Sequence, residues 1–177
     1  MKTWIAILLA AAMLPLCGCL DMPSVHPLYS DQTLVTEPRL AGAWQTRNGK
    51  ENMIVRLTDA REYRLVYIDD REETTLYDLR LVKLGETLVG DIALAKDAGI
   101  PAHHFVALSL EGEGLRVWFL DSEALREKAA KEGLGYAPGK KNELVLTAAT
   151  PAITAFLEKN LADELKNAPD EEFLPLK

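Results

Sequence analysis

The stretch Glu62-Tyr63-Arg64-Leu65-Val66-Tyr67 decides the fold class of this 177-residue chain. Tyr63, Leu65 and Tyr67 are large and apolar, and they alternate with Glu62, Arg64 and Val66. Successive side chains of a β-strand point to opposite faces of the sheet, so a period of two is typical of a half-buried strand. The stretch therefore predicts an antiparallel strand with one face on a hydrophobic core.

The same alternation recurs on both sides of this stretch, with turn signals between the runs. The other runs are Met53–Leu57, Tyr77–Leu81, Leu88–Leu94, Val106–Leu110 and Leu115–Phe119, preceded by Gly42-x-Trp44 and closed by Leu144–Leu146. Arg47-Asn48-Gly49-Lys50 and Glu111-Gly112-Glu113-Gly114 have the composition of hairpin turns. About eight short strands in succession predict a mainly β fold, either an antiparallel meander or an up-and-down barrel.

A surface helix is predicted over residues 122–132, before the last of these runs. Asp121 or Ser122 can cap its first turn. Its apolar face consists mainly of Leu125 and Ala129. So narrow an apolar face indicates a helix that lies on the surface of the domain.

A second helix is predicted over residues 151–166. Thr150 is its predicted N-cap, and Pro151 takes the first helical position, where proline is favoured. An apolar stripe that recurs every four residues is expected to pack on the sheet. The stripe consists of Ile153, Leu157, Leu161 and Leu165, with Phe156 beside them. The tail, residues 169–177, is acidic and then apolar, so docking on the domain and fraying are both open.

The N-terminus resembles a bacterial lipoprotein signal. Lys2 precedes an apolar run from Trp4 to Leu16, which has the length of a secretory h-region and is too short for a membrane-spanning helix. The run ends in Leu16-Cys17-Gly18-Cys19. The resemblance implies that Leu16, Cys17 and Gly18 are recognition residues, that residues 1–18 are removed, and that Cys19 carries diacylglycerol and often an N-acyl chain. The alternative is an ordinary secretory signal that is cut elsewhere.

This processing determines the charge and thiol content of the mature chain. The full chain has 20 basic and 27 acidic residues, and removal of Lys2 leaves a net charge of 19 − 27 = −8. A strongly acidic chain argues against nucleic acid as a partner and against electrostatic binding to anionic lipid. Because Cys17 is removed and Cys19 is acylated, no free thiol and no disulfide remains.

Residues 19–38 are predicted to be the lipidated N-terminus and a spacer, since three prolines keep much of the stretch extended. The residues in it that are able to dock on the domain are Leu28, Tyr29, Leu34 and Val35. A β domain with its C-terminal helix then covers residues 39–168. His26-Pro27-Leu28-Tyr29 and Leu40-x-Gly42-x-Trp44 resemble motifs of a group of predicted bacterial lipoproteins without an assigned activity. This resemblance implies a compartment and a layout only.

The Gly42-x-Trp44 tripeptide also resembles the Gly-x-Trp signature of lipocalins, in which the tryptophan closes the floor of the barrel. A terminal helix against the barrel is similar to lipocalins as well. Other lipocalin signatures are not evident, and the helix at residues 122–132 falls before the last run. Trp44 as an ordinary core aromatic is the alternative. The resemblance implies that inward-facing aromatic side chains line a ligand cavity, the candidates being Trp44, Tyr63, Tyr67 and Tyr77.

Catalytic and metal-binding patterns are not found in the sequence. His103 and His104 are adjacent, so in a strand they point to opposite faces and cannot share one ion, which predicts a structural or surface role. Asp69, Asp70, Glu72 and Glu73 lack the spacing of a dedicated calcium loop and are predicted to form a solvated turn. No nucleophile elbow, phosphate loop or dinucleotide fingerprint occurs. We therefore expect no catalytic residues, no metal and no cofactor besides the lipid.

Two functions remain for such a chain. The first is a non-catalytic envelope lipoprotein, anchored to the membrane, whose lipocalin-like barrel binds a small apolar ligand. The second is a protein-binding or assembly module of the envelope, with a solid barrel core. Leu20, and not an aspartate, follows Cys19 directly. In a Gram-negative source this predicts the outer membrane with the domain facing the periplasm, and in a Gram-positive source the outer face of the only membrane.

Overall fold

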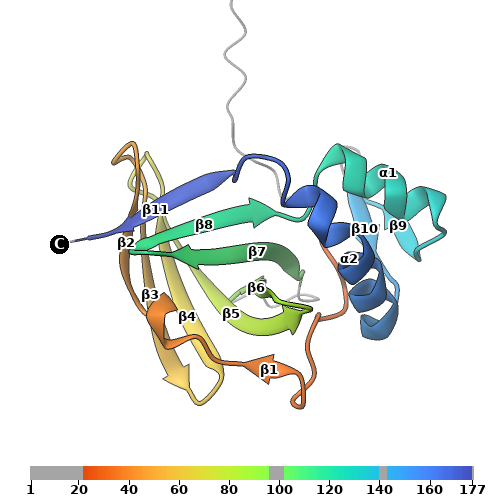
Figure 1. Ribbon diagram of the computed structural model, residues 1–177, viewed down its shortest axis with the longest axis horizontal. Coiled ribbons are helices and arrows are strands. Elements are labelled where there is room, and N and C mark those ends of the chain that lie inside the picture. The colour runs from red at the N-terminus through yellow and green to blue at the C-terminus, as the bar shows by residue number, and fades with distance from the viewer. Residues whose placement is uncertain (1–21, 96–101, 140–142, 177) are drawn as a thin grey trace, which may run out of the picture.

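The computed structural model describes residues 22–95, 102–139 and 143–176 of the chain. Eight antiparallel strands close into a barrel beside a layer that holds two helices (Figure 1). The barrel strands are β2 (Gly42–Thr46), β3 (Asn52–Asp59), β4 (Glu62–Ile68), β5 (Thr74–Leu84), β6 (Thr87–Leu94), β7 (His104–Glu111), β8 (Gly114–Phe119) and β11 (Glu171–Pro175). The predicted up-and-down barrel is therefore confirmed, and every predicted alternating run from residue 42 to residue 119 is a barrel strand.

The barrel is closed by the C-terminal tail. From β2 to β8, each strand pairs with the next strand in chain order, including β5 with β6. Strand β11 pairs with both β8 and β2 and so closes the ring. Phe173 lies opposite Thr46 on one side and Leu115 on the other. The Asp170 carboxylate accepts the Phe119 N–H at 2.7 Å, which guides the chain back to the barrel. The tail is therefore docked, and the domain extends to Pro175 instead of ending at residue 168.

The predicted run Leu144–Leu146 is a strand, β10, but it does not belong to the barrel. It pairs with β9 (Tyr136–Pro138) in a separate two-stranded sheet. Its alternation correctly predicted a half-buried strand. Alternation carries no information on which strand is the partner, so the prediction that these residues complete the barrel was wrong.

Two hydrophobic cores result from the alternation of side chains. One fills the barrel and consists of Leu40, Trp44, Met53, Val55, Tyr63, Leu65, Leu79, Leu81, Val106, Leu108, Leu115, Val117 and Phe173. The other lies between the outer wall of β5–β7 and the helical layer, and it includes Val82, Val89 and Phe105 from the barrel. Strands β5 to β7 thus have both faces covered, whereas β2 to β4 bury only their inner face.

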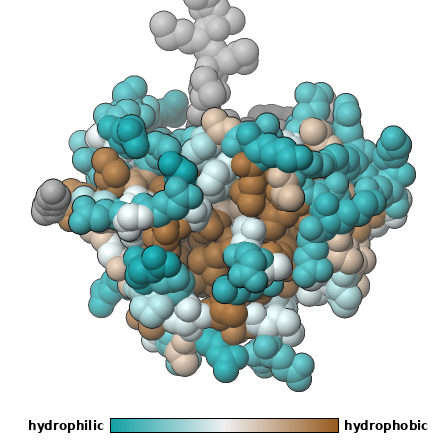
Figure 2. Space-filling model, in the orientation of Figure 1, coloured by the Kyte–Doolittle hydropathy of each residue, from teal (hydrophilic) through white to brown (hydrophobic). Residues whose placement is uncertain are grey.

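The two helices supply the second core from outside. In α1 (Glu123–Lys131) Leu125 and Ala129 are fully buried, and Ser122 caps the helix by accepting the Leu125 N–H at 3.0 Å. In α2 (Thr150–Glu164) the predicted stripe is buried at Ile153, Phe156, Leu157 and Leu161. The surface of this layer, at the right of the view, is mostly hydrophilic (Figure 2).

The predicted cap of α2 was wrong. The structural N-cap is Ala149, no side chain caps the helix, and Pro151 follows the first helical residue instead of occupying it. The Thr150 hydroxyl instead donates to the Pro27 carbonyl at 2.6 Å. The Thr150 hydroxyl thus bonds to a residue far away in sequence. This contact replaces the hydrogen bond to a backbone N–H of the first helical turn that the sequence pattern favours.

The N-terminal segment is part of the folded domain. Met22 and Leu28 are 2 % exposed and belong to the outer core, and Tyr29 packs against it. Strand β1 (Leu34–Val35) pairs with β5, and the short 3-10 helix η1 (Pro38–Leu40) leads into β2. Residues 22–38 are therefore not a free spacer, and the four residues that were named as able to dock all do so.

The signal residues Leu16, Cys17 and Gly18 and the lipid site Cys19 lie outside the described residues. Within the described parts of the chain, neither helix is long and apolar enough to cross a membrane.

Candidate functional site

The four predicted lining residues all face the interior of the barrel. Trp44 and Tyr63 are 5 % and 1 % exposed, and Tyr67 and Tyr77 are half-buried against the same core. The Trp44 Nε1 donates to the Leu40 carbonyl at 3.0 Å. The Tyr63 hydroxyl accepts the Glu37 N–H at 2.9 Å and donates to the Glu37 carbonyl at 3.1 Å. Trp44 and Tyr63 therefore hold the chain around η1 in place and act as structural residues.

Side chains fill the middle of the barrel. Leu81 is fully buried there, and Leu115 is 1 % exposed. A Cβ added to Gly90 would come within 2.9 Å of the Leu79 Cδ1 and 3.1 Å of the Val106 Cγ2. The Leu79 and Val106 side chains therefore pack closely on Gly90, and a methyl group at this position would require the ends of these two side chains to shift.

An open hollow of about 470 Å³ lies at one end of the barrel. Arg39, Trp44, Leu110, Gly112, Glu113 and Pro175 line it. Of the predicted lining residues, the hollow contains only Trp44. The two opposite charges, Arg39 and Glu113, would favour a ligand with a polar end.

A polar cluster occupies the barrel near the end of β4. Burial and the neighbouring Glu51 carboxylate raise the pKa of Tyr67. Burial, together with Glu51 and Asp170, raises the pKa of Glu171 above its ordinary value of 4.5. The Glu51 Oε2 is buried and makes no hydrogen bond. Two like charges beside a phenol in a partly desolvated place favour the protonated form of one carboxyl group.

We expect Glu171→Gln to raise the thermal midpoint at pH 7–8 by about 1–3 °C. A raised carboxyl pKa means that the folded state binds the proton more tightly, so this contribution to stability is present at low pH and lost as the pH rises through the folded-state pKa. The difference between the variant and the wild type should vanish near pH 4. Thermal unfolding followed by circular dichroism between pH 4 and pH 8 measures it.

Glu172→Gln is the matched control because Glu172 faces outward. Its carboxylate forms ion pairs with Arg47 at 3.0 Å and Arg116 at 3.4 Å. Loss of exposed ion pairs should leave the midpoint unchanged or slightly lower. A Glu171→Gln variant that is no more stable than wild type at pH 8 would show that the charged Glu171 carboxylate does not destabilise the folded state.

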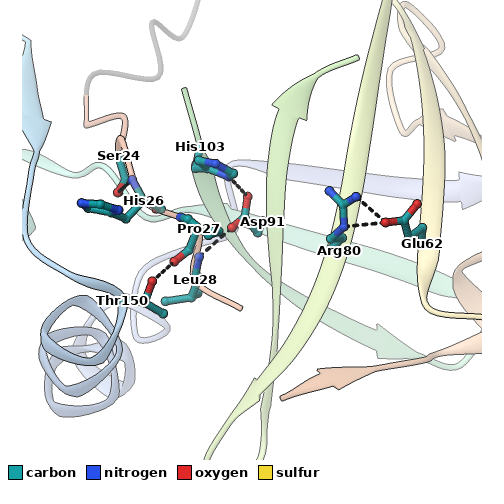
Figure 3. A network of polar contacts seen from close by, with 9 residues as sticks. All are labelled: Ser24, His26, Pro27, Leu28, Glu62, Arg80, Asp91, His103 and Thr150. Carbon is teal, nitrogen blue, oxygen red and sulfur yellow. Dashed lines mark hydrogen bonds and ion pairs between the residues drawn. The ribbon is translucent and has the colours of Figure 1, made fainter. Parts of the chain in front are cut away.

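The second polar site holds the N-terminal segment on the outer wall of the barrel (Figure 3). It consists of Asp91, His103, Ser24 and the His26–Tyr29 motif, and we call it the clasp. Asp91 of β6 is 2 % exposed, and its Oδ2 accepts the Leu28 N–H at 2.7 Å. Its Oδ1 lies 2.7 Å from the His103 Nδ1. Because a carboxylate only accepts hydrogen bonds, the His103 Nδ1 donates. One buried carboxylate thus joins β6, the start of β7 and the His26–Tyr29 motif.

Backbone and cation–π contacts complete this clasp. Ser24 and His103 exchange two backbone hydrogen bonds of 2.8 Å, and the Ser24 hydroxyl donates to the His26 carbonyl at 2.7 Å. The Arg80 guanidinium lies over the Tyr29 ring, 5.0 Å from its centroid, and is held there by Glu62. These contacts assign a structural role to the His26–Tyr29 motif, because they hold the chain on the barrel just before β1.

Asp91→Ala should lower the free energy of unfolding by about 3–5 kcal/mol, since it leaves a buried imidazole and a buried N–H without their partner. Asp78→Ala, which removes a half-exposed ion pair with Arg64, should cost under about 1 kcal/mol. Urea titration measures both, and limited proteolysis should cut the segment before β1 faster in the Asp91 variant. Equal protection in both variants would contradict a clasp.

The two adjacent histidines and the acidic turn at residues 69–73 have structural roles. His103 faces Asp91, whereas His104 takes the inner side of β7, where burial lowers its pKa. In the acidic turn, the Asp69 carboxylate accepts the N–H groups of Arg71 and Glu73 at 2.9 and 2.8 Å. Within the described residues, no group of three or more acidic, histidine or cysteine side chains is placed to hold a metal ion.

The sequence analysis missed Asp91 and Ser24. Asp91 lies between Gly90 and Ile92 on the outer face of β6 and is the charged residue in an otherwise apolar run. This interruption is the only feature of the sequence which indicates that the carboxylate needs a buried partner. Ser24 was missed because its backbone partner, His103, is far away in sequence.

Comparisons with known proteins give no match. No family model matches the chain, no curated protein matches it, and no solved structure matches it. The resemblances to bacterial lipoproteins and to lipocalins therefore stay predictions, and a function has to be proposed from the fold and the side chains described above.

Proposed function

We propose that this protein is a lipid-anchored, non-catalytic protein of the bacterial envelope whose barrel binds another envelope protein. The filled interior of the barrel carries this proposal. Tyr63, Leu81 and Leu115 are at most 1 % exposed inside it, and the Leu79 and Val106 side chains pack closely on Gly90. Of the two functions that the sequence left open, a solid core favours the protein-binding module.

The outer wall of β2 to β5 offers a surface for such a partner. Ala43, Ile54, Val66 and Leu76 lie in register across the four strands and point outward, since their neighbours in sequence face the interior. Leu176 extends this row, because its N–H donates to the Ala43 carbonyl at 2.8 Å. We call these five residues the apolar row. Ile54 and Leu176 are 37 % and 47 % exposed.

The closed barrel restricts how a partner can bind. Each of its eight strands is hydrogen-bonded on both sides, so none offers a free edge to a strand of another protein. A partner that binds the barrel wall itself therefore docks by its side chains on the face of the wall. The apolar row is bordered by Arg64 and Asp78, which pair at 3.0 Å. Such a border of opposite charges fits an apolar helix or strand face with polar flanks.

Cys19→Ser is expected to release the domain from membranes completely. The proposed anchor is a diacylglyceryl group bound covalently to this one sulfur, and serine offers no thiol for it. Palmitate labelling followed by membrane sedimentation measures the effect, with the wild-type protein as the reference that should keep both label and anchor. A Cys19→Ser protein that still labels and sediments would contradict the proposed anchor.

Site-specific photo-crosslinking in the intact envelope tests the protein partner. A crosslinker at position 54 should give one discrete adduct, and a crosslinker at position 94 should not, although Leu94 is 51 % exposed. Ile54→Arg should then prevent co-purification of the same protein, whereas Leu94→Arg should not. Equal adducts from both positions, or an adduct unaffected by Ile54→Arg, would contradict binding at the apolar row.

A small amphipathic ligand is the second proposed function, and the hollow beside Trp44 supports it. Its volume of about 470 Å³ lies in the range of small-molecule sites. Native mass spectrometry of protein extracted from its own membrane would detect such a ligand. Glu113→Trp should displace it, and an unchanged bound mass in that variant would argue against the hollow.

The proposed location follows from Leu20. In a Gram-negative source the domain is anchored in the outer membrane and faces the periplasm, and Leu20→Asp should retain it at the inner membrane. Sucrose-gradient fractionation distinguishes the two membranes. Wild-type protein in the inner-membrane fraction would contradict this location and leave the anchor itself intact.

A further inference from the structure

We propose that the envelope protein at the apolar row carries an acidic side chain that pairs with Arg56, which presupposes the function proposed above and names the chemistry of the partner. Arg56 of β3 is exposed and lies directly opposite Arg64 of β4. Side chains directly opposite each other on neighbouring antiparallel strands are about 5 Å apart at Cβ, and two like charges in such a pair destabilise the folded chain. The outer wall of the barrel thus holds an uncompensated positive charge.

The carboxylates at outward positions of β3, β4 and β5 do not neutralise Arg56, because each has another partner. These partners are Arg64 for Asp78, Arg80 for Glu62, and the Ala60 N–H for Asp59. Within the described parts of the chain, the Arg56 guanidinium forms no hydrogen bond and no ion pair. Its charge is therefore available to a group of another molecule.

A second donor beside Arg56 is also incompletely satisfied. The Arg64 Nε lies 3.0 Å from the Asp78 Oδ1, but it makes no hydrogen bond and is buried. A buried N–H without an acceptor costs free energy. The two arginines together therefore present more hydrogen-bond donors than the carboxylates of the wall accept, and the group that fits beside them is an acceptor with a negative charge.

Arg56 adjoins the apolar row, so one partner element reaches both. Arg56 and Ile54 are two residues apart on the same face of β3, which separates them by about 7 Å. The partner element must therefore present an apolar side chain and a carboxylate at a similar spacing on one face. Residues i and i+2 of a strand meet this condition, and residues i and i+4 of a helix, about 6 Å apart, nearly meet it.

An anionic membrane does not fit the same surface. The acidic turn at residues 69–73 follows β4 at the other end of the wall, and Asp69 is five residues from Arg64, or about 17 Å. A flat anionic surface that covers Arg56 and the apolar row meets this turn as well and is repelled by it. The net charge of the mature chain, 19 − 27 = −8, adds to the repulsion. A single protein element places its carboxylate at Arg56 and leaves the turn free.

Photo-crosslinking from position 54 tests this pairing in the full-length protein within the intact envelope. Arg56→Glu should lower the yield of the discrete adduct about tenfold or more, because it sets a like charge against the carboxylate of the partner. Arg56→Gln, which only removes the charge, should give a yield between those of wild type and Arg56→Glu. Lys131→Glu is the matched control for net charge, since Lys131 is exposed on α1, away from the wall of β2 to β4 (Figure 1), and should leave the yield unchanged.

Thermal unfolding of the same variants separates the lost contact from misfolding. Arg56→Glu should leave the thermal midpoint unchanged or raise it, because it replaces the repulsion from Arg64 by an attraction. The adduct should thus be lost from a chain that is at least as stable as wild type. A lower midpoint of Arg56→Glu would overturn the uncompensated charge from which the pairing follows.

Peptide mapping of the adduct identifies the Asp or Glu of the partner that lies nearest to the crosslink. Exchange of that residue for Arg in the partner should restore the adduct with Arg56→Glu. Equal yields from wild type and Arg56→Glu, or a crosslinked peptide without an acidic residue, would overturn the pairing and leave binding at the apolar row intact. A wild-type protein that gives no adduct at position 54 would overturn the proposed function and the pairing together.

Discussion

Deletion of residues 170–177 is expected to leave a chain that no longer closes its barrel and aggregates on expression. Strand β11 is hydrogen-bonded to β2 on one side and to β8 on the other. Without it, both neighbours become free edges next to an exposed hydrophobic interior, which is the arrangement that promotes intermolecular strand pairing. Size-exclusion chromatography and near-ultraviolet circular dichroism measure the loss. A monomeric truncated chain with a native near-ultraviolet spectrum would contradict this role.

Two neighbouring residues of β11 provide a sharper version of the same test. Phe173 is 4 % exposed inside the barrel, whereas Leu174 is 45 % exposed outside it. Phe173→Ala should lower the free energy of unfolding by about 3–5 kcal/mol, because it leaves a cavity where the ring was. Leu174→Ala, on the outer face, should change it by about 0.5 kcal/mol or less. Urea titration of both variants measures the difference, and similar values would show that β11 does not build the core.

Leu157→Asp is expected to remove most of the stability of the layer outside the barrel. Leu157 is 1 % exposed in the middle of α2, in a core shared with Val82, Val89 and Phe105 of the barrel wall. An unpaired charge in such a place costs several kcal/mol, and a whole domain is stabilised by only about 5–15 kcal/mol. Urea titration should therefore give a large decrease in the unfolding midpoint.

Glu158→Ala is the control for Leu157→Asp, because Glu158 is exposed on the other face of α2 and should have little effect. Trp44 and Trp118, the two tryptophans among the described residues, allow the affected core to be identified. Trp118 donates its Nε1 hydrogen to the Asn167 carbonyl after α2, whereas Trp44 lies inside the barrel. The Trp118 signal should change first. Equal and small effects of both substitutions would mean that α2 does not pack on the wall.

The sequence by itself determined the fold class of this protein and most of its elements. The period of two at Tyr63, Leu65 and Tyr67 correctly assigned these residues to the barrel interior, because alternation is a local property of an extended chain. The same applies to the four-residue spacing of Ile153, Leu157 and Leu161 on α2. Such patterns can be seen without knowing the partner of the buried face.

The tertiary structure alone decided how the barrel closes and what the N-terminal segment does. Among the described residues of the tail, 169–176, Phe173 alone is deeply buried, and its pairing with two strands depends on the return of the chain after α2. The roles of Asp91 and Thr150 depend on contacts with Leu28 and Pro27, more than 60 residues away in each case. Periodicity shows that a face is buried, but only the folded chain brings distant residues together, and those contacts closed the barrel and fixed residues 22–38 on its wall.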